Sequence, residues 1–107
     1  MAGKVLPKPC NGPKYADWTE VDQLLKVGEE YGEINEAYLK LRRCTDTKQA
    51  ADLYIKLMEE CTDLITAVTS FMDKMQFDEN MRQQMQRHIN YNNSIRDNGT
   101  RFKKEEV

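Results

Sequence analysis

The chain has 107 residues, of which 39% are hydrophobic and 32% are charged. This length corresponds to one domain. The formal net charge of −2 gives no overall attraction for a nucleic-acid backbone, so polymeric DNA or RNA is excluded as the expected partner. Its three cysteines, Cys10, Cys44 and Cys61, are widely spaced and predict neither a disulfide framework nor a zinc site. We expect a cytoplasmic protein with no membrane partner, because the N-terminus lacks an apolar signal core and no window reaches the roughly 18 apolar residues of a membrane span.

Residues 1–15 are predicted to form an irregular N-terminal arm. All three prolines of the chain and two of its glycines lie in this segment. Both residue types oppose the interiors of helices and sheets. The sequence leaves two alternatives open for the arm, namely disorder or contact with a neighbouring subunit.

A long helix is predicted from Thr19 to about Arg43. Thr19 and Asp22 approximate a capping box, in which each side chain accepts a backbone N–H from the other residue. Apolar residues then follow at spacings of three and four, the pattern of a seam between packed helices. These residues are Leu24, Val27, Tyr31, Ile34, Tyr38 and Leu41. Gly28 and Gly32 lie inside this helix, where close approach of another helix or room for a ligand would offset their cost of about 1 kcal/mol each.

Two further helices are predicted downstream. Thr45-Asp46-Thr47 marks the start of the second, and its apolar stripe runs from Tyr54 to Met75. Asp78 can cap a third helix that Asn98-Gly99 would end. We find no β-hairpin pattern and no internal repeat. The sequence therefore predicts an all-α helical bundle of three to four helices over residues 16–99, followed by a charged tail at 100–107.

Two pairs of acidic residues stand out on the two long helices. Glu30 and Glu33 are three residues apart, and so are Glu60 and Asp63. Side chains at this spacing lie on one face of a helix. If the two helices pack together, four carboxylates can converge on one spot.

Converging carboxylates repel one another, and desolvating each costs several kcal/mol unless it is compensated. A hard divalent cation supplies the compensation, since Mg²⁺ and Mn²⁺ take carboxylate oxygens and Mg²⁺ also binds substrate phosphates. The pattern predicts a Mg²⁺ site, with Mn²⁺ as the alternative ion. The flanking acids Glu29, Glu36 and Glu59 are expected to be exposed to solvent, although one of them could serve as an auxiliary ligand.

Glu30-Tyr31-Gly32-Glu33, followed after 26 residues by Glu60-Cys61-Thr62-Asp63, resembles a known motif. It is similar to the E-x-x-E…E-x-x-D signature of the all-alpha NTP pyrophosphohydrolases, the MazG-like family that includes dimeric dUTPases and dCTP pyrophosphatases. The glycine before the second glutamate and the apolar run from Leu64 to Val68 also match. The resemblance covers roughly residues 18 to 75 well and the third helix only loosely.

The resemblance implies a single-domain, metal-dependent nucleotide pyrophosphohydrolase with a nucleotide-pool or housecleaning role. Such an enzyme converts a (d)NTP and water to a (d)NMP and pyrophosphate. Glu30, Glu33, Glu60 and Asp63 would be both the metal ligands and the catalytic residues. The family and the high polar content together predict a homodimer or homotetramer that completes the helical core.

The remaining contacts to a nucleoside triphosphate are predicted from side-chain chemistry. Trp18 could stack a base, and Lys74 could reach a phosphate. Polar candidates in and after the third helix are Asn90, Asn93, Arg96 and Arg101. The sole histidine, His88, follows no Glu-x-x-His pattern of a dimetal oxygenase and is expected to be a partly buried packing residue.

Two other interpretations remain open on the sequence. In the first, the acids are solvated helix charges paired with Lys26 or Lys56, and the protein is a non-catalytic helical interaction or regulatory module. Within the enzyme class, a phosphoribosyl-ATP pyrophosphohydrolase-like activity is the further alternative. The preferred base and sugar are not predicted, because specificity depends on a few contacts in a pocket.

Overall fold

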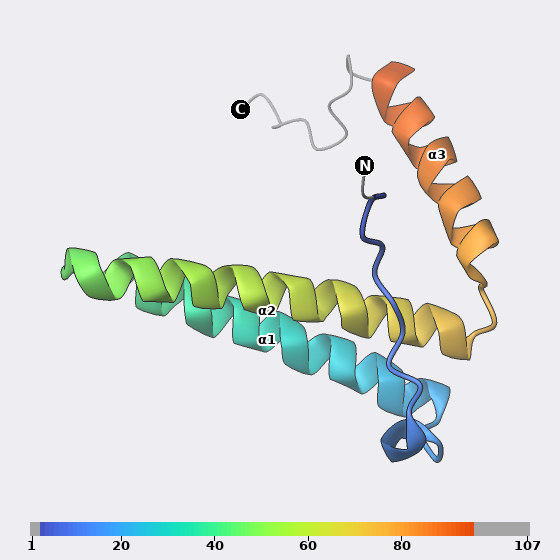
Figure 1. The fold of residues 1–107 in the computed structure, drawn as a ribbon, viewed down its shortest axis with the longest axis horizontal. Coiled ribbons are helices and arrows are strands. Elements are labelled where there is room, and N and C mark those ends of the chain that lie inside the picture. Colours follow the sequence, from blue (N-terminus) through green and yellow to red (C-terminus); the bar gives the residue numbers. More distant parts are fainter. Residues whose placement is uncertain (1–2, 96–107) are drawn as a thin grey trace, which may run out of the picture. The chain divides into compact units, whose positions relative to one another are not determined.

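A computed structural model describes residues 3–95, which form three α-helices and one 3₁₀ turn and contain no strand (Figure 1). In chain order these are η1 (Pro13–Tyr15), α1 (Glu20–Arg43), α2 (Thr47–Lys74) and α3 (Glu79–Ile95). The all-α prediction is confirmed. The chain divides after Gln76 into two units, and each is described separately below.

Both long helices begin at the predicted caps. The Thr19 hydroxyl accepts the Asp22 N–H at 3.1 Å, and the Asp22 carboxylate accepts the Thr19 N–H at 2.9 Å, which completes the capping box of α1. The Asp46 carboxylate accepts the Lys48 N–H at 3.0 Å at the start of α2. These bonds satisfy backbone donors that have no partner within the helix. Gln76 ends the first unit with a φ of 65°, the left-handed conformation common just after a helix.

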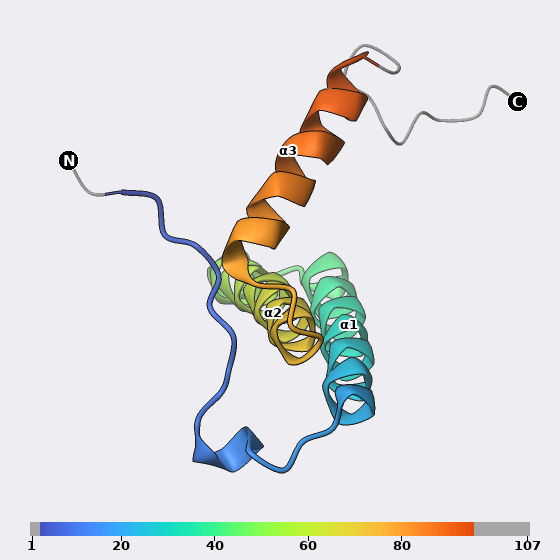
Figure 2. The same cartoon turned by 90° about the vertical axis from the view of Figure 1, so that its right-hand side faces the viewer.

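Helices α1 and α2 form an antiparallel hairpin (Figures 1 and 2). Cys44 to Asp46 connect them, and a connection this short joins antiparallel neighbours. Only two apolar residues in the described chain are buried, Ala37 and Ala67. The other buried side chains are polar or charged: Gln23, Glu30, Glu60, Thr69 and Ser70.

The buried stripe of α1 differs from the predicted one. Gln23, Glu30 and Ala37 are seven residues apart and form a line along the contact with α2. The predicted seam is half-exposed or exposed, and Tyr31 retains 59% of its accessible surface. One residue corresponds to about 100° around a helix, so the apolar stripe through Leu24 and Tyr31 is rotated by that amount from the α2 contact. The expectation of close helix approach at Gly28 and Gly32 is also wrong within residues 3–95, because a Cβ at either position would meet no atom of these residues within 4 Å.

The N-terminal arm lies against its own α2. The Cys10 N–H donates to the Ser70 hydroxyl at 2.9 Å. The arm then enters the short turn η1, and Tyr15 contacts Trp18 edge to face with ring centroids 4.8 Å apart. The segment predicted to be irregular therefore includes one 3₁₀ turn, which begins at Pro13 because proline is tolerated at the first helical position.

The second unit contains α3. The Asp78 carboxylate accepts the Met81 N–H at 2.9 Å, which confirms the predicted cap. No residue of α3 is buried. His88 is exposed and its Nε2 lies 3.1 Å from the Asn92 side-chain nitrogen, so the prediction of a partly buried packing residue is wrong. The predicted stop at Asn98-Gly99 lies outside the described residues.

No helix within residues 3–95 combines the length and the apolar character that a membrane span needs.

Candidate metal centre

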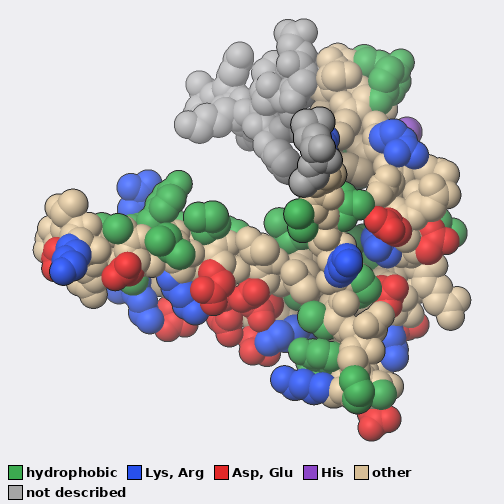
Figure 3. Space-filling view, in the orientation of Figure 1, with side chains coloured by type: hydrophobic (Ala, Val, Ile, Leu, Met, Phe, Trp, Pro, Cys, Tyr) green, Lys and Arg blue, Asp and Glu red, His purple; other side chains and the backbone are tan. Residues whose placement is uncertain are grey.

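The hairpin brings acidic residues from the middle of both long helices together. Glu30 and Glu33 lie one turn apart on α1, and Glu60 and Asp63 lie one turn apart on α2. Glu30, Glu60 and Asp63 each offer one carboxylate oxygen, and these three atoms lie within 4.8 Å of one another. Figure 3 shows acidic side chains gathered on the hairpin, with basic side chains beside them. Three of the four predicted carboxylates therefore converge; Glu33 is not one of these three, but it lines a cavity together with Glu60. We call Glu30, Glu33, Glu60 and Asp63 the acidic centre.

Two of these carboxylates are almost completely removed from solvent. Glu30 and Glu60 each keep only 5% of their accessible surface. The Oε2 atom of each is buried and has no hydrogen-bond partner among the described residues. Carboxylate oxygens are normally buried only when they are paired, because desolvating them is costly. These two oxygens therefore have free coordination capacity directed into the protein.

Each buried glutamate is held by a lysine one turn earlier on its own helix. Lys26 Nζ lies 3.0 Å from Glu30 Oε1, and Lys56 Nζ lies 2.9 Å from Glu60 Oε1. The hydrogen bond from each lysine to its glutamate is the largest cause that raises the pKa of the lysine. The ion pairs considered in the alternative sequence interpretation are thus present. Its assumption that Glu30 and Glu60 are solvated is wrong.

Glu33 has a raised pKa because of the carboxylates around it. Its interaction with Glu60 is the largest cause that raises the pKa of Glu33 to about 7, and the charge of Glu30 adds to it. The Lys56 ammonium is the largest cause that lowers the pKa of Glu60. Desolvation, followed by the charges of Glu30 and Glu60, raises the pKa of Asp63. Crowded like charges produce such shifts, and a cation in the centre would reverse them.

The three flanking acids lie outside this centre. Glu29 and Glu59 are each 60% exposed, and each pairs with the lysine three residues before it, at 3.3 and 3.4 Å. Glu36 is 68% exposed and pairs with Lys40 at 3.5 Å. Their predicted exposure to solvent is confirmed.

The sequence contains a repeat that explains this arrangement. Residues 26–33 and 56–63 both read K-x-x-E-E-x-x-[E/D], exactly one copy on each helix of the hairpin and 30 positions apart. The prediction that the chain has no internal repeat is therefore wrong for these eight residues. Because the helices are antiparallel, the two copies face each other across the hairpin.

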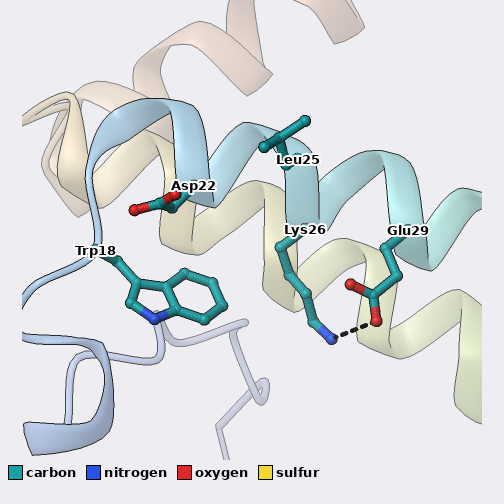
Figure 4. A pocket seen from close by; sticks show the side chains of 5 residues that line it. All are labelled: Trp18, Asp22, Leu25, Lys26 and Glu29. Atoms are coloured by element: carbon teal, nitrogen blue, oxygen red, sulfur yellow. Dashed lines mark hydrogen bonds and ion pairs between the residues drawn. The ribbon is translucent and has the colours of Figure 1, made fainter.

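Trp18 lies at the edge of the acidic centre. It lines a cavity of about 240 Å³ together with Glu30 and Asp63, and we call this the Trp18 cavity. The rest of the lining is Cys10, Tyr15, Gln23, Lys26, Thr66, Ala67 and Ser70. Figure 4 shows the indole beside Lys26, in an adjoining cavity of about 330 Å³ that Asp22, Leu25 and Glu29 also line.

Of the other predicted substrate contacts, only Lys74 belongs to the same unit as the acidic centre. Lys74 lines a cavity with Trp18 and the residues around the start of α1, and that cavity contains none of the four central acids. Asn90 and Asn93 belong to α3 in the second unit, where Asn90 Oδ1 accepts a hydrogen bond from Gln86 at 2.9 Å. Arg96 and Arg101 lie outside the described residues.

Comparison of the chain with models of protein families, with curated proteins and with solved structures found no match. All four central side chains offer oxygen, which selects a hard cation such as Mg²⁺ or Mn²⁺ over a softer metal. The two partnerless buried oxygens are the feature that such an ion fits.

Proposed function

We propose that this protein is a metal-dependent nucleoside triphosphate pyrophosphohydrolase, which converts a (d)NTP and water to a (d)NMP and pyrophosphate. The observation that carries the proposal is the pair of buried carboxylate oxygens without partners, Glu30 Oε2 and Glu60 Oε2. An ordinary helix seam would fill this position with apolar side chains. The similarity of the two acidic pairs to the E-x-x-E…E-x-x-D signature supports the same class of reaction.

Glu30, Glu33, Glu60 and Asp63 would hold Mg²⁺, with Mn²⁺ as a substitute. The bound ion would neutralise phosphate charge and lower the pKa of a bound water. The side chains of the centre position the carboxylate oxygens and release a proton when the cation binds. Lys26 and Lys56 fix one oxygen of each buried glutamate and leave the other directed into the centre. Glu33 couples cation binding to the release of its proton, since its pKa lies close to neutrality.

The nucleoside part of the substrate would occupy the Trp18 cavity. An indole offers a flat face on which any base can stack. The buried Gln23 amide in the same cavity carries both a donor and an acceptor for the edge of a base. Lys26 lines the same cavity and pairs with Glu30, and it would contact a phosphate there.

We further propose that the active protein is a cytoplasmic homodimer or homotetramer. Large apolar side chains on both helices of the hairpin remain exposed, including Leu25 at 67%, Tyr54 at 63% and Ile55 at 58%. Another copy of the hairpin could cover them and complete the core that one chain lacks. The three cysteines are free thiols, as a reducing compartment would keep them.

The direct test is a panel of canonical NTPs and dNTPs assayed for pyrophosphate release. We expect release with millimolar Mg²⁺ and none with EDTA. Thermal unfolding without nucleotide is the parallel measurement, because a ligand that binds only the folded state raises Tm. An unchanged Tm with Mg²⁺ and Mn²⁺, together with no hydrolysis, would instead favour a non-catalytic helical module. Hydrolysis of phosphoribosyl-ATP alone would favour the related pyrophosphohydrolase class.

A further inference from the structure

The acidic centre has a cavity on each of two sides, and the two cavities differ. The first is the Trp18 cavity, which contains Glu30 and Asp63. The second has a volume of about 310 Å³ and contains Glu33 and Glu60; we call it the Lys40 cavity. The repeat explains the pairing, because each cavity combines the buried glutamate of one copy with the last acid of the other copy.

The lining of each cavity indicates a different kind of ligand. Trp18 and Tyr15 line the first, whereas the second is lined by no aromatic side chain among the described residues. The first cavity has one ammonium group, from Lys26. The second has two, from Lys40 and Lys56.

The additional lysine is available to a ligand. Lys40 is 64% exposed, and its only ion pair among the described residues is with Glu36, which is 68% exposed. Exposed pairs of this kind contribute little, so the ammonium group can turn toward a bound anion at small cost. Lys56 is 54% exposed and lines the same cavity.

We propose that these unequal sides orient a nucleoside triphosphate across the acidic centre. The base lies in the Trp18 cavity, the α-phosphate lies at the carboxylates, and the β- and γ-phosphates extend into the Lys40 cavity toward Lys40 and Lys56. This orientation rests on the proposed function and assigns Lys40 as a binding residue for the leaving pyrophosphate. The reverse orientation would place the charged phosphates among the aromatic rings and leave the base without a stacking partner.

The assignment gives the two lysines a role in the reaction. The water oxygen forms a bond to the α-phosphorus, and the bond from that phosphorus to the oxygen bridging to the β-phosphate breaks. The electron pair of the broken bond leaves on pyrophosphate, and the proton lost by the water passes to a carboxylate of the centre and then to solvent. Ammonium groups beside the leaving group stabilise the negative charge that develops there.

Binding of the two product fragments separates the two sides. Isothermal titration with Mg²⁺ present would use inorganic pyrophosphate and a deoxynucleoside monophosphate as probes. Lys40→Gln should weaken pyrophosphate binding by roughly fivefold, the scale of one charge-assisted contact, and leave monophosphate binding unchanged. Trp18→Leu should weaken monophosphate binding by at least about fivefold through lost stacking and leave pyrophosphate binding unchanged.

Matched controls test for general effects of charge and of aromatic loss. Lys48→Gln removes the same charge from α2 at a residue that lines neither cavity, and Phe77→Leu removes an exposed aromatic ring that also lines neither. Both controls should bind both probes like wild type. Far-UV circular dichroism verifies that each variant is folded.

The outcomes distinguish the orientation from the proposed function. A crossed pattern, in which Lys40→Gln weakens the monophosphate and Trp18→Leu weakens pyrophosphate, would overturn the orientation. Equal effects of both variants on both probes, or no effect of either, would overturn it as well, even if wild type hydrolyses triphosphates. If wild type binds neither probe and hydrolyses no triphosphate, the proposed function itself fails and the orientation fails with it.

Discussion

The contact between α1 and α2 and the outer surface of the same hairpin reverse the usual distribution of side chains. The contact buries Gln23, Glu30 and Glu60, whereas Leu24 and Tyr31, each one residue further along α1, are exposed. Most domains bury apolar residues and leave carboxylates in water. This two-helix unit does the opposite. We propose that a cation in the interior and a second copy of the chain on the exterior compensate for this distribution.

The comparison separates what a cation and what a partner subunit would each contribute. Under the proposed function, a cation would add charge compensation to the buried carboxylates beyond what Lys26 and Lys56 supply. The exposed apolar stripe has no role in that chemistry, because it is rotated by about 100° from the α2 contact. Variants in the two regions should therefore have different consequences.

The largest effect is expected from Glu33→Gln. The amide keeps the shape of the side chain but loses the charge that binds a cation, so kcat/KM should fall about 100-fold or more. Glu36→Gln, on the exposed side of the same helix, should cost far less. Steady-state kinetics with Mg²⁺ on both variants provides the measurement. Equal and mild losses would show that the acidic centre is only a charged surface.

The apolar stripe should respond to Leu24→Asp with loss of assembly. Burying an unpaired carboxylate in an apolar contact costs several kcal/mol, so Tm should fall by about 10 °C or more. Light scattering should show wild type at twice the 12.5 kDa chain mass or more, and the variant at the mass of one chain. Gln49→Asp, on an exposed polar position of α2, is the control. A wild-type protein that is monomeric at micromolar concentration contradicts the prediction.

Asp63→Asn tests repulsion inside the centre. Without metal, the variant should melt at or above the temperature of wild type in EDTA, because neutralising one of several crowded carboxylates relieves repulsion. With saturating Mg²⁺, wild type should gain about 10 °C and the variant should lose most of that gain. Differential scanning fluorimetry in both buffers measures the four values. A variant that melts clearly lower in EDTA, beside a wild type that ignores Mg²⁺, would assign Asp63 a structural role.

The raised pKa of Glu33 predicts a pH dependence with a definite sign. The folded pKa of about 7 lies above the ordinary value of 4.5, so between these values the folded state binds more protons than the unfolded state. The stability of the metal-free protein should therefore fall as pH rises from 4.5 to 7. Mg²⁺ competes with the same proton, so its affinity should weaken about tenfold per pH unit below 7. Glu33→Gln should flatten both profiles, and profiles unchanged by that substitution would assign the titration to another group.

The smallest effect is expected at Gly32. A Cβ there would meet nothing within 4 Å in the hairpin, so Gly32→Ala should stabilise α1 by about 1 kcal/mol through helix propensity alone. Urea unfolding of the metal-free protein measures the difference. A loss of stability would mean that a partner subunit packs against this glycine, and it would extend the subunit contact beyond the apolar stripe.

Much of the fold could be predicted because its signals are local. The caps at Thr19, Asp46 and Asp78 bond backbone groups two or three residues away, so the sequence around each helix start contains both partners. The spacing of Glu30 and Glu33 likewise follows from helix geometry alone. Lys26 precedes Glu30 by four residues and Lys56 precedes Glu60 by four, so the spacing of each ion pair also follows from helix geometry.

The sequence by itself determined three helices, their starts and two acidic faces. Only the tertiary structure decided which stripe of α1 meets α2, and hence that Glu30 and Glu60 are buried while Leu24 and Tyr31 are exposed. It also decided which oxygens lack partners, why the pKa of Glu33 is raised, and that Trp18 and Lys40 lie on different sides of the centre. The physical reason is that rotation and register between two helices depend on contacts between residues far apart in the chain. An apolar pattern shows that a helix face will be covered, but not whether its own hairpin or another subunit covers it.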